Sequence, residues 1–263
     1  DKYVGSFHHD QFEEGTYEAK NGLYYKGKFR NGLKEGYGTY VLKGAIEYEG
    51  DFKDDEFHGQ GKLKNIKLGT EYVGGFEKGL KNGEGRLSEP SGAVYFGEFV
   101  RNEKQGRGTY TFKDKTYEGE FRGNRFEGKG KLTYGNGDEY AGDFADGRKH
   151  GKGRLTLARA REFYEGAFEH DKIGGFGTLT YANGDVYEGY HSDNKKHGKG
   201  RYVCKAKDEI WEGAWDMDVK HGDFTETQRR TNRRVAGTYV KGQRDGQFTT
   251  TDESSGTVVA HAG

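Results

Sequence analysis

One short pattern recurs along this chain and constrains its fold more than any other feature. An aromatic residue is followed by glycine two places later and by a second aromatic residue at the fifth place, and the copies are spaced 22 to 24 residues apart. They begin at Tyr3, Tyr25, Tyr48, Tyr72, Tyr95, Tyr117, Tyr140, Tyr164, Tyr187, Trp211 and the degenerate Val235. Self-similarity at a fixed period indicates a repeat architecture. The sequence therefore predicts one continuous array of about eleven repeats over residues 1–263.

Each repeat carries a second block, in which two glycines flank one residue and a hydrophobic residue follows, as in residues 59–63. Both blocks alternate with period two, which is typical of a strand with two different faces. Turn-forming pairs such as Asn31-Gly32 separate the blocks, and Asn136-Gly137 separates two repeats. Each repeat is therefore predicted to be one β-hairpin. The predicted fold is all-β, an elongated single twisted antiparallel sheet of tandem hairpins in an open, solenoid-like array.

The alternation places Tyr117, Gly119 and Phe121 on one face together with Gly128 and Gly130 of the second strand. A strand glycine costs about 0.5–1 kcal/mol relative to alanine. A buried ring removes roughly 150–250 Å² from water. We therefore expect each bare glycine backbone to accept a ring from a neighbouring strand. The opposite face is expected to carry acidic first strands and basic second strands that pair across each hairpin.

Composition narrows the classes of function. Lys plus Arg and Asp plus Glu number 43 each, so no net field draws nucleic acid to the chain. Cys204 is the only cysteine, which excludes an intrachain disulfide and favours a reducing compartment. No apolar run approaches the roughly 18 residues of a membrane span, and the chain opens with Asp1-Lys2-Tyr3 rather than a signal peptide. The expected localisation is cytoplasmic.

The sequence offers little catalytic chemistry. Its paired glycines lie in predicted strands and lack the Gly-Lys-Ser/Thr context of a phosphate loop, and no nucleophile elbow occurs. His58, His150, His197 and His221 all precede the first glycine of a second block, which indicates turn-flanking residues. A metal shared by His197, His221 and Cys204 is the weaker alternative. We therefore predict no enzyme activity, no metal and no cofactor.

The two motifs together, YxGxF followed by GxGx(L/Y), resemble the MORN repeat family over nearly the whole chain. The end repeats depart from the pattern, because Gly222-Asp223-Phe224 and Gly246-Gln247 lose the second glycine. Terminal repeats of an array are commonly atypical because they cap it.

The resemblance implies a structural scaffold or adaptor that binds other proteins, or a second copy of itself as a homodimer. It further implies a cytoskeletal setting, such as a ciliary or flagellar axoneme. The alternatives are a peripheral membrane module that binds anionic phosphoinositide lipids and a targeting segment of a larger enzyme. Nucleic acid is not expected as a partner.

Two sets of residues are candidates for contact with a partner. The aromatic stripe of the middle repeats is predicted to line a partner-binding groove, although the same rings are expected to hold the sheet together. It comprises Tyr72, Phe76, Tyr95, Phe99, Tyr117, Phe121, Tyr140, Phe144, Tyr164 and Phe168. The basic loop of Arg229, Arg230, Arg233 and Arg234 is either a solvated loop or a contact for an acidic protein or anionic lipid.

Overall fold

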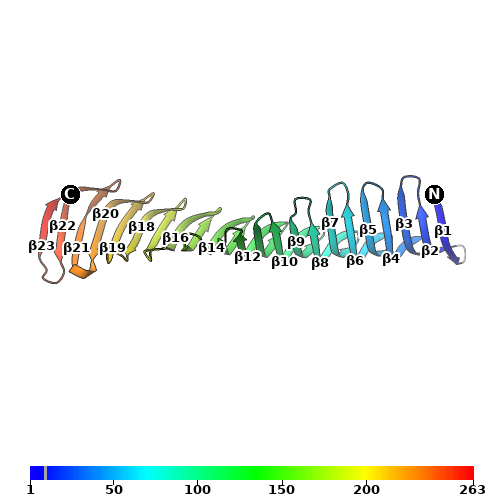
Figure 1. Cartoon of the computed structure of the whole chain (residues 1–263), viewed down its shortest axis with the longest axis horizontal. Coiled ribbons are helices and arrows are strands. Elements are labelled where there is room, and N and C mark those ends of the chain that lie inside the picture. Colours follow the sequence, from blue (N-terminus) through cyan, green and yellow to red (C-terminus); the bar gives the residue numbers. More distant parts are fainter. Residues whose placement is uncertain (9–10) are drawn as a thin grey trace. The chain divides into compact units, whose positions relative to one another are not determined.

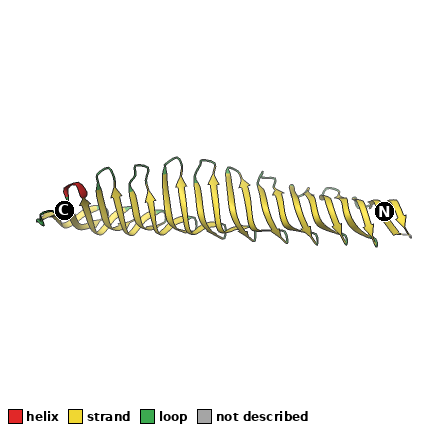
Figure 2. Ribbon diagram, turned by 90° about the horizontal axis from the view of Figure 1, so that it is seen from below, coloured by secondary structure: helices red, strands yellow, loops and turns green. Residues whose placement is uncertain are grey.

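The computed structural model describes the backbone of residues 1–8 and 11–263, and the side chains except those of residues 7, 8, 11 and 12. Nearly all of this chain is β-strand, and the strands belong to one 23-stranded antiparallel sheet (Figure 2). The helical structure among the described residues is a single 3-10 turn, η1 (Arg229–Thr231). The predicted all-β sheet of tandem hairpins is confirmed.

Two compact halves make up the chain, residues 1–128 and residues 129–263. Within each half, strands that follow one another in sequence lie side by side and pair antiparallel (Figure 1). The N-terminal strands are β1 (Lys2–His8), β2 (Gln11–Glu18), β3 (Leu23–Arg30), β4 (Leu33–Leu42), β5 (Ile46–Lys53), β6 (Glu56–Asn65), β7 (Thr70–Glu77), β8 (Leu80–Ser88), β9 (Val94–Val100), β10 (Glu103–Phe112) and β11 (Lys115–Arg122).

The boundary between the halves falls within β12 (Arg125–Tyr134). The remaining strands are β13 (Glu139–Ala145), β14 (Arg148–Leu157), β15 (Glu162–Glu169), β16 (Lys172–Thr180), β17 (Val186–Ser192), β18 (Lys195–Cys204), β19 (Glu209–Asp216), β20 (Val219–Gln228), β21 (Arg233–Val240), β22 (Gln243–Asp252) and β23 (Val258–Ala262). Strand β23 contains Val259, near the end of the chain, where the repeat motif is no longer complete.

Hairpin turns inside the repeats use two residues with positive φ. Arg101 and Asn102, for example, have φ angles of 49° and 73°. Two left-handed residues form a type I′ turn, whose twist matches that of the strands it joins. Asn, Asp or Gly at the second turn position meets this requirement at low cost.

Hairpins in both halves of the chain have a register shift at the first glycine of the second strand. In the β13–β14 pair Gly142 faces Gly153, as the alternation predicts. The register then shifts, so that Phe144 faces Lys149. Gly151 adopts a φ of 62° at this bulge. The prediction that both glycines of the second block continue one simple register was therefore wrong, because a left-handed residue interrupts the alternation.

In repeats such as that of Tyr95, the glycine of the first block and the second glycine of the second block lie directly beneath the tyrosine ring. A Cβ added to Gly97 would come within 2.6 Å of the Tyr95 hydroxyl, and one added to Gly108 would come within 2.6 Å of the Tyr95 ring. The Tyr95 hydroxyl donates a hydrogen bond of 3.0 Å to the Glu98 carbonyl. Each ring thus covers the glycine of its own strand as well as that of the paired strand. Gly108 thus accepts a ring from a neighbouring strand, as expected, whereas the ring over Gly97 belongs to its own strand.

Ion pairs on the opposite face join consecutive repeats. Lys62 of β6 lies 3.1 Å from Glu71 of β7, and Arg201 of β18 lies 3.1 Å from Glu212 of β19. These pairs connect the second strand of one repeat to the first strand of the next, whereas the sequence suggested pairing within each hairpin. The register alone does not select these partners, because Lys62 also faces Glu49 and Arg201 also faces Glu188 inside their own hairpins.

A second connection between repeats was not evident from the sequence. The amide of Lys81 donates to Asn102 Oδ1 at 2.9 Å, and the amide of Asn102 donates to the Lys81 carbonyl at 3.0 Å. The same two-bond clasp joins other turns to the preceding repeat through Asp55, Asn124, Asp171, Asn194 and Asp218. Gly79 and Gly242 occupy the equivalent position and keep only the backbone bond.

Candidate partner-binding surfaces

The ten rings predicted to line a groove form the interior of the sheet. Their exposed fractions lie between 0 and 4%, in the set Tyr72, Phe76, Tyr95, Phe99, Tyr117, Phe121, Tyr140, Phe144, Tyr164 and Phe168. Neighbouring rings meet edge to face, as Tyr95 does with Phe99 at 5.1 Å and with Phe121 at 4.9 Å between centroids. A partner cannot touch these rings without displacing the side chains that cover them, and their role in partner binding stays a prediction.

Burial keeps the interior tyrosines protonated. It raises the pKa of Tyr72 to about 12, and it is also the main cause of the raised pKa of Tyr164, again about 12. Their hydroxyl groups serve as hydrogen-bond donors to the carbonyls of Gly75 and Ala167. These tyrosines are structural donors rather than acid–base groups.

The face that carries these rings, here called the ring face, is covered by side chains from second strands of the repeats. In several repeats this side chain is a lysine. Lys104 places its ammonium 4.2 Å from the Tyr110 ring centroid and pairs with Glu89 at 3.3 Å. In two of the repeats whose side chains are described, phenylalanine stands there instead, and Phe57 stacks on Tyr48 with 3.8 Å between centroids. The ring face is thus closed by cation–π and stacking contacts.

Lys196 is held most completely on the ring face. Its ammonium lies 4.7 Å from the Trp215 centroid, 5.3 Å from that of Tyr202, 5.8 Å from that of Tyr187 and 5.9 Å from that of Tyr181. Burial lowers the pKa of this amine. The four rings form an enclosure for a cation, and the chain fills it with its own side chain.

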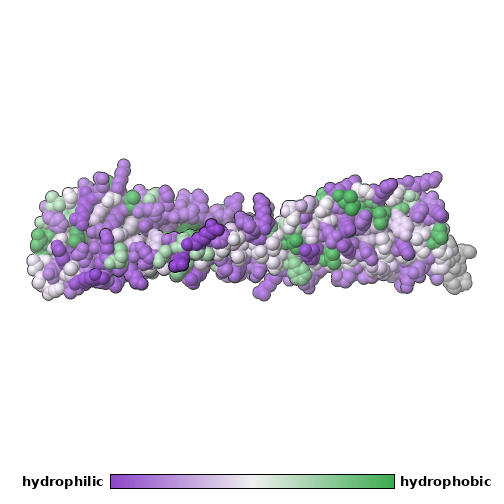
Figure 3. Space-filling view, viewed as in Figure 1, coloured by the Kyte–Doolittle hydropathy of each residue, from purple (hydrophilic) through white to green (hydrophobic). Residues whose placement is uncertain are grey.

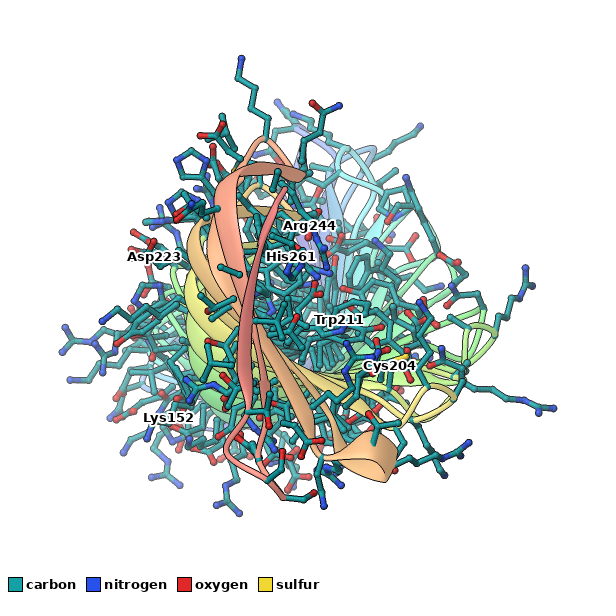
Figure 4. All side chains as sticks on the ribbon, turned by 90° about the vertical axis from the view of Figure 1, so that its left-hand side faces the viewer. Lys152, Cys204, Trp211, Asp223, Arg244 and His261 are labelled. Atoms are coloured by element: carbon teal, nitrogen blue, oxygen red, sulfur yellow. The ribbon has the colours of Figure 1, made fainter. Side chains whose placement is uncertain are left out.

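The opposite face, here called the charged face, carries the second and fourth side chains of the first block. In Figure 4, Lys152 and Asp223 point away from the ribbon on the side opposite to Trp211 and Arg244. Figure 3 shows hydrophilic side chains over most of the visible surface, with separate hydrophobic patches between them.

An aromatic pair interrupts the charged face of the C-terminal half. Phe176 and Tyr190 are 51% and 52% exposed, face each other across β16 and β17, and have their ring centroids 5.5 Å apart. Sequence analysis missed this pair. The available signal was a departure from the repeat pattern, because the equivalent places in the neighbouring second strands hold Lys152 and Lys199.

Two hollows flank this aromatic pair. Hollow A, of about 510 Å³, is lined by Lys152, Ala167 and Phe176. Hollow B, of about 650 Å³, is also lined by Phe176, together with Tyr190 and Ala214. Glycine backbone forms the floor of each hollow, and the alanines stand where other repeats have longer side chains.

The N-terminal half has a smaller hollow of about 430 Å³ on the same kind of face. Its wall includes Phe96, which is exposed, together with Glu98 and Arg107. Tyr37 is also exposed, but its hydroxyl donates to Glu49 at 2.6 Å. These exposed rings are separate, whereas Phe176 and Tyr190 touch.

The basic loop has a partly compensated charge. Arg229 and Arg230 share Asp208, at 4.0 and 3.8 Å. Arg233 and Arg234 begin β21 and are exposed. Two of the four predicted contact residues thus face a carboxylate of the chain itself.

The described residues contain no cluster of three or more His, Cys, Asp or Glu side chains that could hold a metal. Cys204 is a buried free thiol, and His197 faces Asp216 at 3.4 Å. Among these residues no helix has the length and apolarity that a membrane crossing requires.

His191 stands where most repeats place the second ring of the first block. It is 5% exposed, and its imidazole meets Tyr164 and Tyr187 edge to face, each at 5.0 Å. Neither ring nitrogen has a hydrogen-bond partner in the described chain. Burial is the main cause of its lowered pKa. This histidine is a neutral member of the ring core.

Comparison with known families identifies the repeat. The family model described as MORN repeat matches eight segments, at residues 25–43, 48–64, 72–94, 95–116, 117–139, 140–158, 164–186 and 187–208. These segments make up more than half of the chain and begin at eight of the repeat starts read from the sequence. No curated protein matches the chain.

Solved structures with a similar backbone include two domains from Drosophila melanogaster. The TCP domain of SAS-4 in complex with a proline-rich motif of Ana2 has 10% sequence identity and a TM-score of 0.41, and the match covers 68% of this chain and 90% of that domain. The TCP10c domain of Sas-4 has 11% identity and a TM-score of 0.38, and covers 60% of this chain and 93% of that domain.

Proposed function

Because the chain belongs to the MORN repeat family, we propose that it is a non-enzymatic scaffold or adaptor that binds partner proteins on the faces of its sheet. The setting proposed is a cytoplasmic, cytoskeletal assembly such as a ciliary axoneme. In this proposal the ten buried rings give the sheet its shape, and the exposed side chains make the contacts. A homodimer remains part of the proposal.

The observation that carries this proposal is the pair of hollows beside exposed aromatic rings on an otherwise charged face. Solvent-exposed apolar groups that touch each other commonly mark an interaction site. The tyrosines, the residue type most abundant in the core, are held protonated and bonded to backbone carbonyls. In this proposal the core therefore has a structural role, and the exposed surface recognises partner proteins.

Cross-linking followed by mass spectrometry on the full-length protein purified from cells tests the proposal. A scaffold is expected to yield repeated cross-links from surface lysines, such as Lys152 and Lys199, to a small set of partner proteins. Absence of any cross-linked partner above the level of an unrelated protein of equal abundance would overturn it.

A second candidate function, binding of anionic lipid, is favoured by the exposure of Arg233 and Arg234. Liposome flotation with and without phosphoinositide measures it. Salt-sensitive flotation that is lost in the Arg233→Ala and Arg234→Ala double variant would support this reading, with Arg229→Ala and Arg230→Ala as a second pair. Flotation unchanged by these substitutions, or absent from the start, would rule the loop out as a lipid contact.

A further inference from the structure

The aromatic pair on the charged face occupies positions that the chain fills differently elsewhere. The place of Phe176 lies between the two glycines of a second block, where other repeats have Arg107 or Lys129. The place of Tyr190 is the fourth of a first block, where another repeat has Glu120. Arg107 and Glu120 face each other across β10 and β11, as Phe176 and Tyr190 do across β16 and β17. An exposed ring pair thus replaces an exposed pair of opposite charges.

Small residues stand on both sides of this pair. Ala167 faces Lys152, and Ala214 faces Lys199, so that each lysine lacks the acidic cross-strand neighbour that Arg107 has. Neither Lys152 nor Lys199 makes an ion pair with any residue that the structure describes. The alanines open hollows A and B, and the aromatic pair forms the ridge between them.

The two hollows differ in charge. Hollow A is lined by Lys129, Lys152, Arg154 and Glu165. Lys129 pairs with Asp143 and Arg154 with Glu165, so the positive charge that remains there is that of Lys152. Hollow B is lined by the basic residues Lys199 and Arg201 against the acidic residues Glu188, Glu212 and Asp223. A ligand that spans both hollows therefore meets a mainly basic wall at one end and a mainly acidic wall at the other.

The sheet also sets the spacing between the hollows. The floor of hollow A is glycine backbone of β13 to β16, centred between β14 and β15, and that of hollow B is glycine backbone of β18 and β19. Four strand steps separate them, or roughly 19 Å at about 4.8 Å per step. An extended peptide advances about 3.3 Å per residue, so roughly six residues cover this distance. Residues six apart in an extended peptide point to the same side.

We propose that the charged face of the C-terminal half binds an extended peptide of a partner protein, which crosses the ridge of Phe176 and Tyr190 and places one apolar side chain in each hollow. The peptide carries an acidic residue beside the side chain in hollow A and a basic residue beside the one in hollow B. This inference rests on the proposed scaffold function and assigns to it a surface and a ligand chemistry. Complementary charges at the two ends fix the direction of the peptide.

Selection from a library of random dodecapeptides displayed on phage tests the inference with the full chain as bait. Enriched sequences are expected to hold two apolar residues about six apart, with an acidic residue near one and a basic residue near the other. Fluorescence anisotropy with one enriched, labelled peptide then measures affinity. Raising the salt concentration is expected to weaken its binding.

The matched variants use residues that the chain itself places at equivalent positions. F176R combined with Y190E recreates the Arg107–Glu120 pair, and A167E alone fills hollow A. Each is expected to weaken peptide binding at least tenfold, with the circular dichroism and melting temperature of the wild type. Tyr37→Arg, at the place equivalent to Phe176 in the N-terminal half, is expected to leave the affinity unchanged.

Three outcomes would overturn the inference. One is that no peptide is enriched on the wild type relative to the F176R/Y190E bait. Another is that enriched peptides bind both proteins equally. The third is that the wild type sediments as a dimer and the F176R/Y190E variant as a monomer, which would show that this face binds a second copy of the chain.

The cellular cross-links separate this inference from the scaffold function. If F176R/Y190E keeps every partner cross-linked to the wild type, the scaffold stands and this surface is not its contact. If the wild type has no partner, the scaffold proposal itself falls, whatever the peptide selection yields.

Discussion

Tyrosine is the side chain that unites the requirements of a single repeat. Its ring covers two paired glycines, its edge meets the phenylalanine four places on, and its hydroxyl bonds a carbonyl three places on, as Tyr140 does with Asp143 at 2.8 Å. Phenylalanine could supply the ring but not the hydrogen bond. A larger residue in place of either glycine would remove the space for the ring. The tyrosine and the two glycines beneath it are therefore interdependent.

Gly142→Val tests this interdependence. A Cβ at Gly142 would lie 2.5 Å from Gly153 Cα and 2.6 Å from the Lys152 carbonyl oxygen, which are backbone atoms that cannot step aside. We expect the free energy of unfolding, measured by urea denaturation, to fall by about 3 kcal/mol. The exposed neighbour Ala141→Val is expected to change it by less than about 0.5 kcal/mol. Equal effects of the two substitutions would contradict the described packing.

His191→Phe is expected to stabilise the chain and to change its response to acid. Removing two buried nitrogens without partners should raise the free energy of unfolding by about 1 kcal/mol at neutral pH. The folded imidazole has a lowered pKa, whereas in the unfolded chain it titrates near 6.5. Below about pH 6.5 the imidazole binds a proton in the unfolded state but not in the folded state, so the free energy of unfolding falls as the pH drops.

Lys196, whose charge further lowers the His191 pKa, and Asp218, whose charge raises it, face the imidazole. Urea denaturation between pH 7 and pH 5 provides the measurement. The phenylalanine variant should lose part of the acid-dependent decrease, while substitution of the exposed His170 by phenylalanine should preserve it. A wild type and a His191→Phe variant with parallel pH profiles would refute the assignment.

At the level of the hairpin, the turn reverses the chain and also connects its repeat to the preceding one. Its second residue joins the preceding repeat through a side-chain and a backbone hydrogen bond, and the type I′ geometry points both groups at the same residue. Gly79 and Gly242 satisfy the backbone geometry but provide no side-chain acceptor. The clasp therefore has a two-bond and a one-bond form within one chain.

Asn102→Gly should convert a two-bond clasp into a one-bond clasp. Glycine keeps the left-handed backbone, so the substitution removes the acceptor for the Lys81 amide without adding strain. We expect a loss of about 1 kcal/mol and faster hydrogen exchange at the Lys81 amide. Asn102→Asp retains an acceptor oxygen and should exchange at nearly the wild-type rate. Unchanged protection in the glycine variant would show that water replaces the clasp.

At the scale of the whole molecule, stability is expected to be local, because the strand pairings among the described residues join sequence neighbours within each compact half. Gly97→Val, which would bring a Cβ within 2.6 Å of Gly108 Cα, should speed hydrogen exchange in β8 to β11. Strands β17 to β22 should keep their protection. Mass spectrometry of exchanged peptides makes the comparison, and a uniform loss of protection throughout the chain would show global cooperativity instead.

The repeat pattern determined the fold from the sequence because its period and its glycines are local signals. The starts at Tyr25 and Tyr187 coincide with matched family segments, and both lie in first strands of hairpins. The bulge at Gly151 was not predictable from alternation, since alternation assumes that every residue is extended. Phe176 and Tyr190 were not predicted, because the repeat motif specifies the positions that the repeats share and this pair occupies positions that vary between repeats.

Clasps and type I′ turns also bear on how such a chain lengthens. Every clasp reaches back by 20 to 22 residues, so an added or deleted segment preserves the bonding only when it amounts to one whole hairpin. A single inserted residue between two turns would leave a donor and an acceptor facing the wrong partners. Tandem duplication of complete hairpins is therefore the easy evolutionary step, and an engineer can change the length in the same increment.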